Sequence, residues 1–239
     1  MKRLLCHWAL KLTATFCKNH GPKIVYYHDL GCTYTNMGTE IDLIKAHVAA
    51  TREDGFQFVD SITHLRSAKT VHLCFDDGFR GIWDHAEWLA TEHLHPTVFI
   101  PIDLIGQGGY LTWSEVLELQ RLGVCFEGHT WSHRPLTDVP KAEWQHELRD
   151  AKCFLEDKLA KEVSCLCFPC GYFSDDVIHA AKEAGYHYLV ASYPGCVDLD
   201  ETLIPRHLVQ SLPEEDYRLV LQGALGPFRA RYIRQHKKP

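Results

Sequence analysis

Short runs of apolar and β-branched residues alternate along the chain with longer stretches in which apolar positions recur every three or four residues. The short runs predict buried strands, and the periodic stretches predict amphipathic helices. The predicted strands are residues 24–27, 71–75, 97–100, 124–127, 164–168, 186–191 and 204–209. The predicted helices lie near residues 39–54, 79–93, 112–122, 141–159 and 174–184. Strand and helix therefore alternate along most of the chain.

Local signals mark the ends of two of these helices. Thr112-Trp113-Ser114-Glu115 has the spacing of a capping box, and Gly123 stops the helix that it opens. Ser174 is a second predicted N-cap, for a helix that ends at Gly185.

Repeated alternation of strand and helix predicts parallel strands joined by crossover helices. With seven or eight strands, the chain is predicted to be an α/β protein with an irregular TIM-like (β/α)7–8 barrel, and a doubly wound open sheet is the alternative. We expect an N-terminal helical segment at residues 1–22, the barrel domain at 23–212 and a C-terminal basic tail at 213–239.

Composition narrows the class of protein. The chain has 239 residues and a net charge of −6, which suits one soluble domain and argues against nucleic acid as a partner. Cys74, Cys125, Cys165 and Cys167 lie in apolar runs, where a thiol behaves as a small hydrophobe. We therefore expect free thiols in a reducing compartment and a cytoplasmic protein, with a periplasmic location as the alternative.

The two ends of the chain suggest a second kind of partner. The N-terminus begins like a signal peptide, but His7 and Lys11 interrupt its apolar stretch. Residues 1–17 have the character of an interfacial amphipathic helix, and the tail from Phe228 is basic. Peripheral membrane contact through the termini is one expectation, and a solvated basic end is the other.

A first chemical signal is Phe75-Asp76-Asp77-Gly78, directly after a predicted strand. Neighbouring carboxylates repel each other, so a metal ion or an arginine is expected beside them. Taken alone, the motif is also typical of an ordinary polar turn.

A second signal is Gly128-His129-Thr130-Trp131-Ser132-His133. Histidines four residues apart on a helical turn can bind one metal ion. Thr130 stands where a zinc protease of the familiar type needs Glu, so that class is disfavoured. A chain with 16 histidines also produces such spacings by chance.

Together the two signals describe a three-ligand site with positions left for water and substrate, beside a spare carboxylate that can serve as a base. Phe168-Pro169-Cys170-Gly171-Tyr172 and Tyr26-Tyr27-His28 also follow predicted strands. In a parallel barrel these strand ends share one face, where active sites are built.

On these motifs, from about residue 24 to 209, the chain resembles the polysaccharide deacetylase family (the NodB-homology domain, carbohydrate esterase family four). The aromatic-Asp-Asp-Gly motif matches residues 75–78, and His-Ser/Thr-x-x-His matches residues 129–133. The resemblance implies that Asp77, His129 and His133 bind a metal, usually zinc. It also implies that Asp76 is the catalytic base and that a backbone N–H near Cys170 stabilises the oxyanion.

The third family motif departs from the usual form. Cys167 stands where the family has Arg, and Cys170 stands where it has an aromatic residue. The segment from Phe168 to Gly171 is closer to the poly-N-acetylglucosamine deacetylase branch, whose Tyr-His motif implies His28 as general acid. We further hypothesise that Arg206 approaches Asp76 and replaces the missing Arg.

The resemblance implies a metal-dependent hydrolase that removes the N-acetyl group from an amino sugar. The expected substrate is an oligo- or polysaccharide, or a lipid- or nucleotide-linked glycan of surface-glycan biosynthesis. Zn²⁺ is the expected metal, and Co²⁺, Ni²⁺ or Fe²⁺ also suit the ligands. The residues expected to bind substrate or the oxyanion are Pro169, Cys170, Tyr172 and Trp131.

Three other functions compete with this one. The same framework can hydrolyse a non-sugar amide, or serve a non-catalytic glycan-binding relative, although a binder has no need of Asp76 as a base. A two-metal nuclease or phosphatase needs more carboxylates than these motifs supply.

Overall fold

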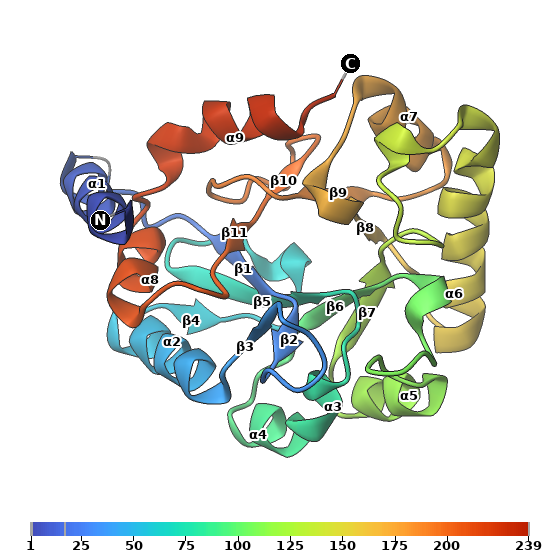
Figure 1. Cartoon of the computed structure of the whole chain (residues 1–239), viewed down its shortest axis with the longest axis horizontal. Helices are drawn as coiled ribbons and strands as arrows, with labels where there is room; N and C mark the ends of the chain where they lie inside the picture. Colours follow the sequence, from blue (N-terminus) through green and yellow to red (C-terminus); the bar gives the residue numbers. More distant parts are fainter. Residues whose placement is uncertain (1, 17, 239) are drawn as a thin grey trace.

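The computed structural model describes residues 2–16 and 18–238, with side chains from His7 onward, and Figure 1 shows its arrangement. Its strands are β1 (Lys23–Tyr27), β2 (Asp29–Leu30), β3 (Gly38–Thr39), β4 (Gln57–Phe58), β5 (Thr70–Asp76), β6 (Thr97–Ile100), β7 (Cys125–Gly128), β8 (Cys165–Cys167), β9 (Tyr188–Ala191), β10 (Ile204–Pro205) and β11 (His207–Leu208). Its α-helices are α1 (Lys2–Phe16), α2 (Ile41–Glu53), α3 (Gly81–Asp84), α4 (Ala86–Thr91), α5 (Trp113–Arg121), α6 (Ala151–Leu159), α7 (Asp175–Glu183), α8 (Glu214–Leu221) and α9 (Arg229–His236).

The main sheet of the described chain has its strands in the order β10-β9-β8-β7-β6-β5-β1-β11, with β4 on β5, and its pairings are parallel. Only Arg206 separates β10 from β11, so the segment from Ile204 to Leu208 pairs first with β9 and then with β1. This segment joins the two edges of the sheet. The fold is therefore the predicted irregular (β/α)7–8 barrel and not an open doubly wound sheet.

Two apolar layers hold the barrel together. The larger lies between the strands and the helices around them, and it includes Val25, Leu73 and Val98. A smaller one fills the inside of the barrel, where Tyr26 and Phe99 pack with buried cysteines. Successive residues of a strand point to opposite faces, so strands covered on both sides are apolar throughout, as the sequence runs indicated.

Most predicted helices are confirmed, and two of them differ in detail. The capping box of α5 has both of its hydrogen bonds, between the side chains and backbones of Thr112 and Glu115. The helix predicted near residues 79–93 is divided at His85 into α3 and α4. The helix predicted near 141–159 begins with a 3₁₀ turn and a π-helical segment, Gln145–Asp150, before α6. Such π-turns are frequent at functional sites.

Both ends of the chain are helical. Leu10 and Ala14 of α1 pack against Ala224, just after α8, and the predicted basic tail contains α8 and α9. Positions 1, 17 and 239, within the segments predicted for the two termini, lie outside the described residues. Of the helices described, none is long and apolar enough to span a bilayer.

Candidate active site

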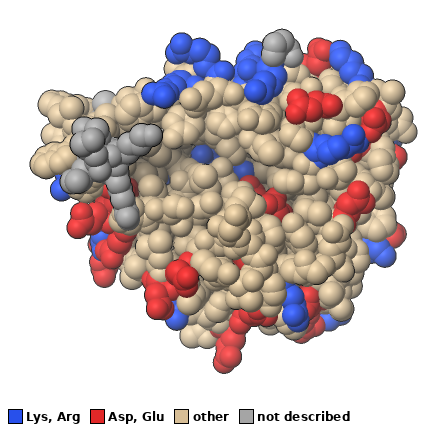
Figure 2. Space-filling view, in the orientation of Figure 1, with Lys and Arg blue, Asp and Glu red and all other residues tan. Residues whose placement is uncertain are grey.

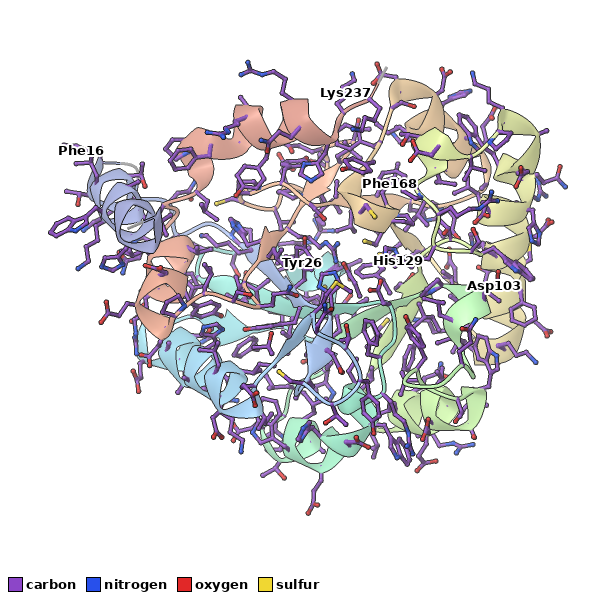
Figure 3. The ribbon with its side chains drawn as sticks, in the orientation of Figure 1. Phe16, Tyr26, Asp103, His129, Phe168 and Lys237 are labelled. Atoms are coloured by element: carbon purple, nitrogen blue, oxygen red, sulfur yellow. The ribbon has the colours of Figure 1, made fainter. Side chains whose placement is uncertain are left out.

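The carboxyl ends of β1, β5, β7 and β8 carry the four polar segments singled out in the sequence. His28 follows β1, Asp77 follows β5, His129 follows β7 and Pro169 follows β8. Parallel strands of a barrel end on one face, so these segments share that face. Figure 3 labels Tyr26 of β1 near the middle of the view and His129 to its right, and the surface in Figure 2 is hollowed near the middle of the same view.

Asp76 and Arg206 form a buried ion pair inside this end of the barrel. Arg206 donates from Nη1 to Oδ1 of Asp76 at 2.7 Å and from Nη2 to Oδ2 at 2.9 Å. Burial raises the pKa of the Asp76 carboxyl, but the charge and hydrogen bonds of Arg206 outweigh it, and the pKa lies below its usual range. A bidentate pair of this kind fixes the orientation of the carboxylate as well as its charge.

Cys167 lies against the same guanidinium, with Nη2 of Arg206 2.9 Å from its Sγ. The short thiol at this position leaves room for a guanidinium that arrives from another strand. The Arg206 side chain also lies over the Tyr26 ring, 4.0 Å from its centroid. The approach of Arg206 to Asp76 expected from the sequence is therefore present, and its effect on turnover stays a prediction.

Asp77, His129 and His133 form a second group, here called the Asp–His cluster. Oδ1 of Asp77 lies 2.9 Å from Nε2 of His133 and 3.4 Å from Nε2 of His129. The two Nε2 atoms are 3.2 Å apart. Burial raises the pKa of the Asp77 carboxyl, but its contacts with the two imidazoles bring the pKa well below the usual range. The three atoms converge on one point.

The hydrogen-bond partner of the other ring nitrogen of His129 indicates that this point suits a cation. Its Nδ1 lies 2.7 Å from the carbonyl oxygen of Cys167, which can only accept, so the proton of the neutral ring is on Nδ1. The lone pair of Nε2 then faces His133 and the buried Oδ1 of Asp77, which has no partner with hydrogen-bond geometry among the described residues. Ligands of a tetrahedral zinc ion lie about 3.3 Å from one another, since each is about 2.0–2.2 Å from the metal. The cluster fits a divalent cation.

The backbone that carries the two histidines is not the helical turn that the spacing predicted. Residues 129–133 form a bent loop, and Thr130 and His133 have φ of 68° and 64°, in the left-handed region. The hydroxyl of Thr130 accepts a hydrogen bond from the backbone N–H of His133 at 3.2 Å. This bond closes the loop, and the ring nitrogens meet although the segment is not the helical turn on which the spacing argument relied.

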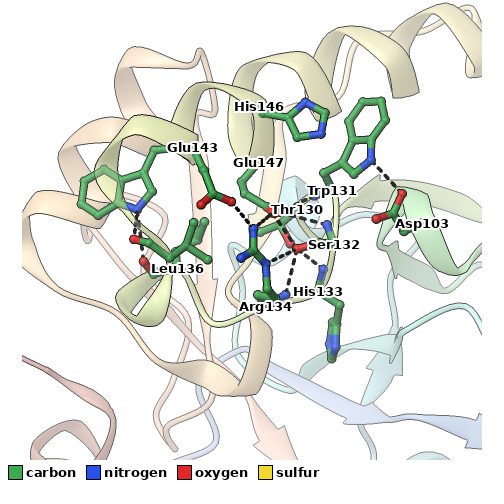
Figure 4. A network of polar contacts seen from close by, with 12 residues as sticks. Asp103, Thr130, Trp131, Ser132, His133, Arg134, Leu136, Glu143, His146 and Glu147 are labelled. Atoms are coloured by element: carbon green, nitrogen blue, oxygen red, sulfur yellow. Dashed lines mark hydrogen bonds and ion pairs between the residues drawn. The ribbon is translucent and has the colours of Figure 1, made fainter.

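Glu147 holds this loop through hydrogen bonds (Figure 4), and the sequence motifs did not identify it as a site residue. It is buried in the π-helical segment and accepts from the backbone N–H groups of Trp131 and Ser132 at 3.1 and 3.0 Å, and from the Ser132 hydroxyl at 2.6 Å. Burial raises its pKa, but the bonds from Ser132 and Arg134 outweigh burial and lower it. One feature of the sequence could have identified Glu147, because it is an acidic residue on the apolar side of the helix predicted at residues 141–159.

Trp131, which is expected from the sequence to bind substrate, makes several contacts within the protein. Its Nε1 donates to Asp103 at 2.8 Å, and its ring packs 4.2 Å from the ring centroid of His146 and 5.4 Å from that of Phe154. In Figure 4 the indole points away from His133. The indole therefore packs against α6 and the preceding π-helical segment and anchors the loop to them.

The remaining candidates line the rim of the same barrel end. Nδ1 of His28 is 2.6 Å from Oε1 of Gln210, and the charge of His28 helps to lower the pKa of Asp76. Cys170 follows the buried Pro169 with φ of 57°, and burial together with the charge of Asp77 raises the pKa of its thiol. The Tyr172 ring lies 4.2 Å from Nζ of Lys238.

Comparisons with known proteins agree with this fold. The sequence profile described as polysaccharide deacetylase matches residues 65–189, just over half of the 239 residues. YxkH of Bacillus subtilis strain 168 carries a polysaccharide deacetylase name. It is 26% identical in an alignment of 213 residues, which covers 84% of this chain and 76% of YxkH.

Two solved structures share the fold. IcaB from Ammonifex degensii superposes with a TM-score of 0.75 at 17% identity, over 86% of this chain and 98% of IcaB. The Streptococcus pyogenes deacetylase PplD, solved in complex with acetate, gives 0.73 at 20% identity, over 83% of this chain and 97% of PplD. With its profile matched over half its length and its barrel shared, the chain belongs to the polysaccharide deacetylase family.

Proposed function

We propose that this protein hydrolyses the acetamide group of an N-acetylated amino sugar, releasing acetate and a free amine, with the help of a divalent metal ion. One observation carries the proposal: the Asp–His cluster lies beside a carboxylate that Arg206 keeps ionised and fixed. A cation site and a base next to each other are what metal-assisted amide hydrolysis needs.

Asp77, His129 and His133 would hold the metal, with zinc as the first expectation for two imidazoles and a carboxylate. A bound divalent cation would supply Lewis-acid polarisation of the amide carbonyl and of the attacking water. The protein's own part is to orient the ligands. The carbonyl of Cys167 fixes the tautomer of His129, and Glu147 fixes the loop.

Asp76 takes the proton of the attacking water as its oxygen bonds to the amide carbon. Arg206 acts through Asp76 and is a positioning residue, because its two hydrogen bonds keep the carboxylate ionised and aimed. The third-motif Cys167 makes room for this arrangement.

The amine leaves with a proton from His28, and the C–N bond breaks to give acetate. The bond from His28 to Gln210 holds the imidazole at the end of β1. A backbone N–H of the turn at Cys170 stabilises the negative charge that forms on the former carbonyl oxygen of the amide.

The sugar class is supported by the family and by the acetate in PplD, which is the product that this reaction would release. We propose that Tyr172, half-buried at the rim with Lys238 against its ring, contacts the sugar. We propose a role in surface-glycan biosynthesis, with an oligo- or polysaccharide, or a lipid- or nucleotide-linked glycan, as substrate.

The first experiment measures bound metal by elemental analysis and acetate release from N-acetylglucosamine oligomers, with and without added Zn²⁺ or Co²⁺. About one metal ion per chain with metal-dependent acetate release is expected. Stoichiometric metal without acetate would assign the site to another amide. No metal under any loading condition would overturn the proposal.

A further inference from the structure

Charge is divided along the chain between its middle and its two ends. The acidic residues, 31 in all, lie from Asp29 to Asp216, so both termini carry Lys and Arg with no carboxylate side chain. The fold then brings the two basic ends together. Residues of α1 and α9 line one groove of about 610 Å³, which is mainly apolar.

The outer side of α1 is apolar and uncovered. Trp8, Leu12 and Phe16 have exposed fractions of 64%, 62% and 78%. Residues four apart share a helix face, so these three form one stripe. Leu10 and Ala14 are buried on the opposite side against Ala224. The helix is thus held to the protein by one face and shows an aromatic and aliphatic face to its surroundings.

Basic side chains lie on α9, across the groove from α1, while Glu215 and Asp216 of α8 lie against His7 at the other side of α1. Figure 2 shows Lys and Arg gathered along the edge formed by α9. Arg231 and Arg234 are exposed, and no described carboxylate lies within ion-pair distance of either. Their neighbours Arg229 and Lys237 instead pair with Glu201 and Asp175 and tie α9 to the barrel.

The same surface continues to the rim of the candidate active site. The backbone N–H of Lys238 donates to the carbonyl of Phe173 at 2.8 Å, which joins the end of α9 to the segment that follows β8. On the other side, Leu208 and Leu212 line the groove, and Gln210 between them contacts His28.

We infer that the face made by Trp8, Leu12, Phe16, Arg231 and Arg234, here called the terminal face, binds the surface of an anionic lipid bilayer. An amphipathic helix with aromatic residues buries its apolar side at the boundary between headgroups and acyl chains. Each Lys or Arg near an anionic leaflet adds attraction that weakens with salt. An anionic bilayer matches both the apolar stripe of α1 and the cations of the neighbouring α9 that have no described carboxylate partner. This binding is independent of the proposed reaction.

The test is flotation of the full-length protein with vesicles of phosphatidylcholine alone or of equal parts phosphatidylcholine and phosphatidylglycerol. We expect the protein to bind only the anionic vesicles, and we expect this binding to weaken as the NaCl concentration is raised. Arg231→Gln with Arg234→Gln should weaken binding about tenfold or more, given the attraction of each cation. Leu12→Ser with Phe16→Ser should weaken it by a similar factor.

The matched control is Lys45→Gln with Lys182→Gln, which removes two exposed cations from α2 and α7. This control should bind vesicles as the unaltered protein does. All the variants should have the unfolding temperature of the unaltered protein and its rate of acetate release from a soluble substrate. Equal binding to neutral vesicles, or an equal loss in the control, would overturn the inference. A dimer that forms without lipid would also overturn the inference if the double variant Leu12→Ser with Phe16→Ser were monomeric. The terminal face would then bind a second copy of the chain.

Discussion

Asp76 and Asp77 are neighbours in the sequence but have opposite surroundings. Asp76 ends β5 and meets the permanently charged guanidinium of Arg206. Asp77 has φ of 71°, and this left-handed residue turns the chain so that its carboxylate meets His129 and His133 instead. Both carboxyl pKa values lie below the usual range, one through a fixed cation and the other through imidazoles.

This difference separates two tasks. An arginine is not deprotonated in proteins and its fork fits a carboxylate, so it holds Asp76 as a fixed base. A neutral imidazole offers the lone pair of its unprotonated nitrogen to a metal ion, so Asp77, which faces two imidazoles, is the carboxylate that suits a ligand. One tight turn therefore gives two adjacent identical residues different chemistry.

The strongest test of the comparison replaces each carboxylate by its amide. Asp76→Asn should lower kcat by about 10²–10⁴, the range for removal of a general base, while metal content is unchanged. Asp77→Asn should lower metal content itself. Acetate release and elemental analysis measure the two effects, and exposed Asp157→Asn is the control. Loss of metal in Asp76→Asn, or full activity in it, would contradict the division of tasks.

Arg206→Met should destabilise the protein by about 3–5 kcal/mol, because it leaves a buried carboxylate without its partner. Adding Asp76→Asn to that variant removes the charge and should recover much of the free energy of unfolding, without recovering activity. Denaturant unfolding of the two single variants and the double variant measures this coupling. Strict additivity of the three values would show that the pair does not act as a unit.

Glu147→Gln should weaken metal binding by about 10–100-fold, the usual range for residues that orient metal ligands. The amide accepts fewer of the bonds from Trp131 and Ser132, so the loop loses definition. Titration with Co²⁺, followed by its visible spectrum, measures the affinity. Glu143→Gln is the matched control, since Glu143 also pairs with Arg134 but does not bond the loop backbone. Equal effects of the two changes would reject the assignment.

The smallest expected effect is a loss of folding stability in mild acid, where the carboxylates of Asp76 and Asp77 both stay ionised. His72 of β5 is buried between the carbonyl of Val59 and the hydroxyl of Thr97, and burial lowers its pKa to about 4. Because this value is below that of an unfolded chain, its stabilising contribution is complete above about pH 6.5 and is lost as pH falls towards 4.

At pH 5.5 the loss from this one residue is about 1 kcal/mol. His72→Asn removes the titrating group, so its free energy of unfolding should fall less between pH 7 and 5.5 than that of the unaltered protein. Denaturant unfolding at the two pH values measures the difference. Parallel losses in the two proteins would show that other groups cause the acid sensitivity.

The sequence by itself determined the barrel and the order of its elements. Apolar runs identified the strands because parallel strands are covered on both faces, and the caps of α5 and α7 depend on neighbouring residues alone. The motifs placed Asp77, His129 and His133 at strand ends, which is enough to bring them to one face. These features are local, or follow from the periodicity of a strand.

Only the tertiary structure decided what each side chain meets there. Left-handed residues at Thr130 and His133 replaced the predicted helical turn, because a loop closed by the Thr130 hydroxyl can aim both rings inward. Arg206 reaches Asp76 from 130 positions away, and Glu147 reaches the loop from the next helical segment. Contacts between distant segments carry no periodic signal in one sequence. The departure of Cys167 from the family motif suggested Arg206 only as a hypothesis, and packing alone determined which acid holds the loop.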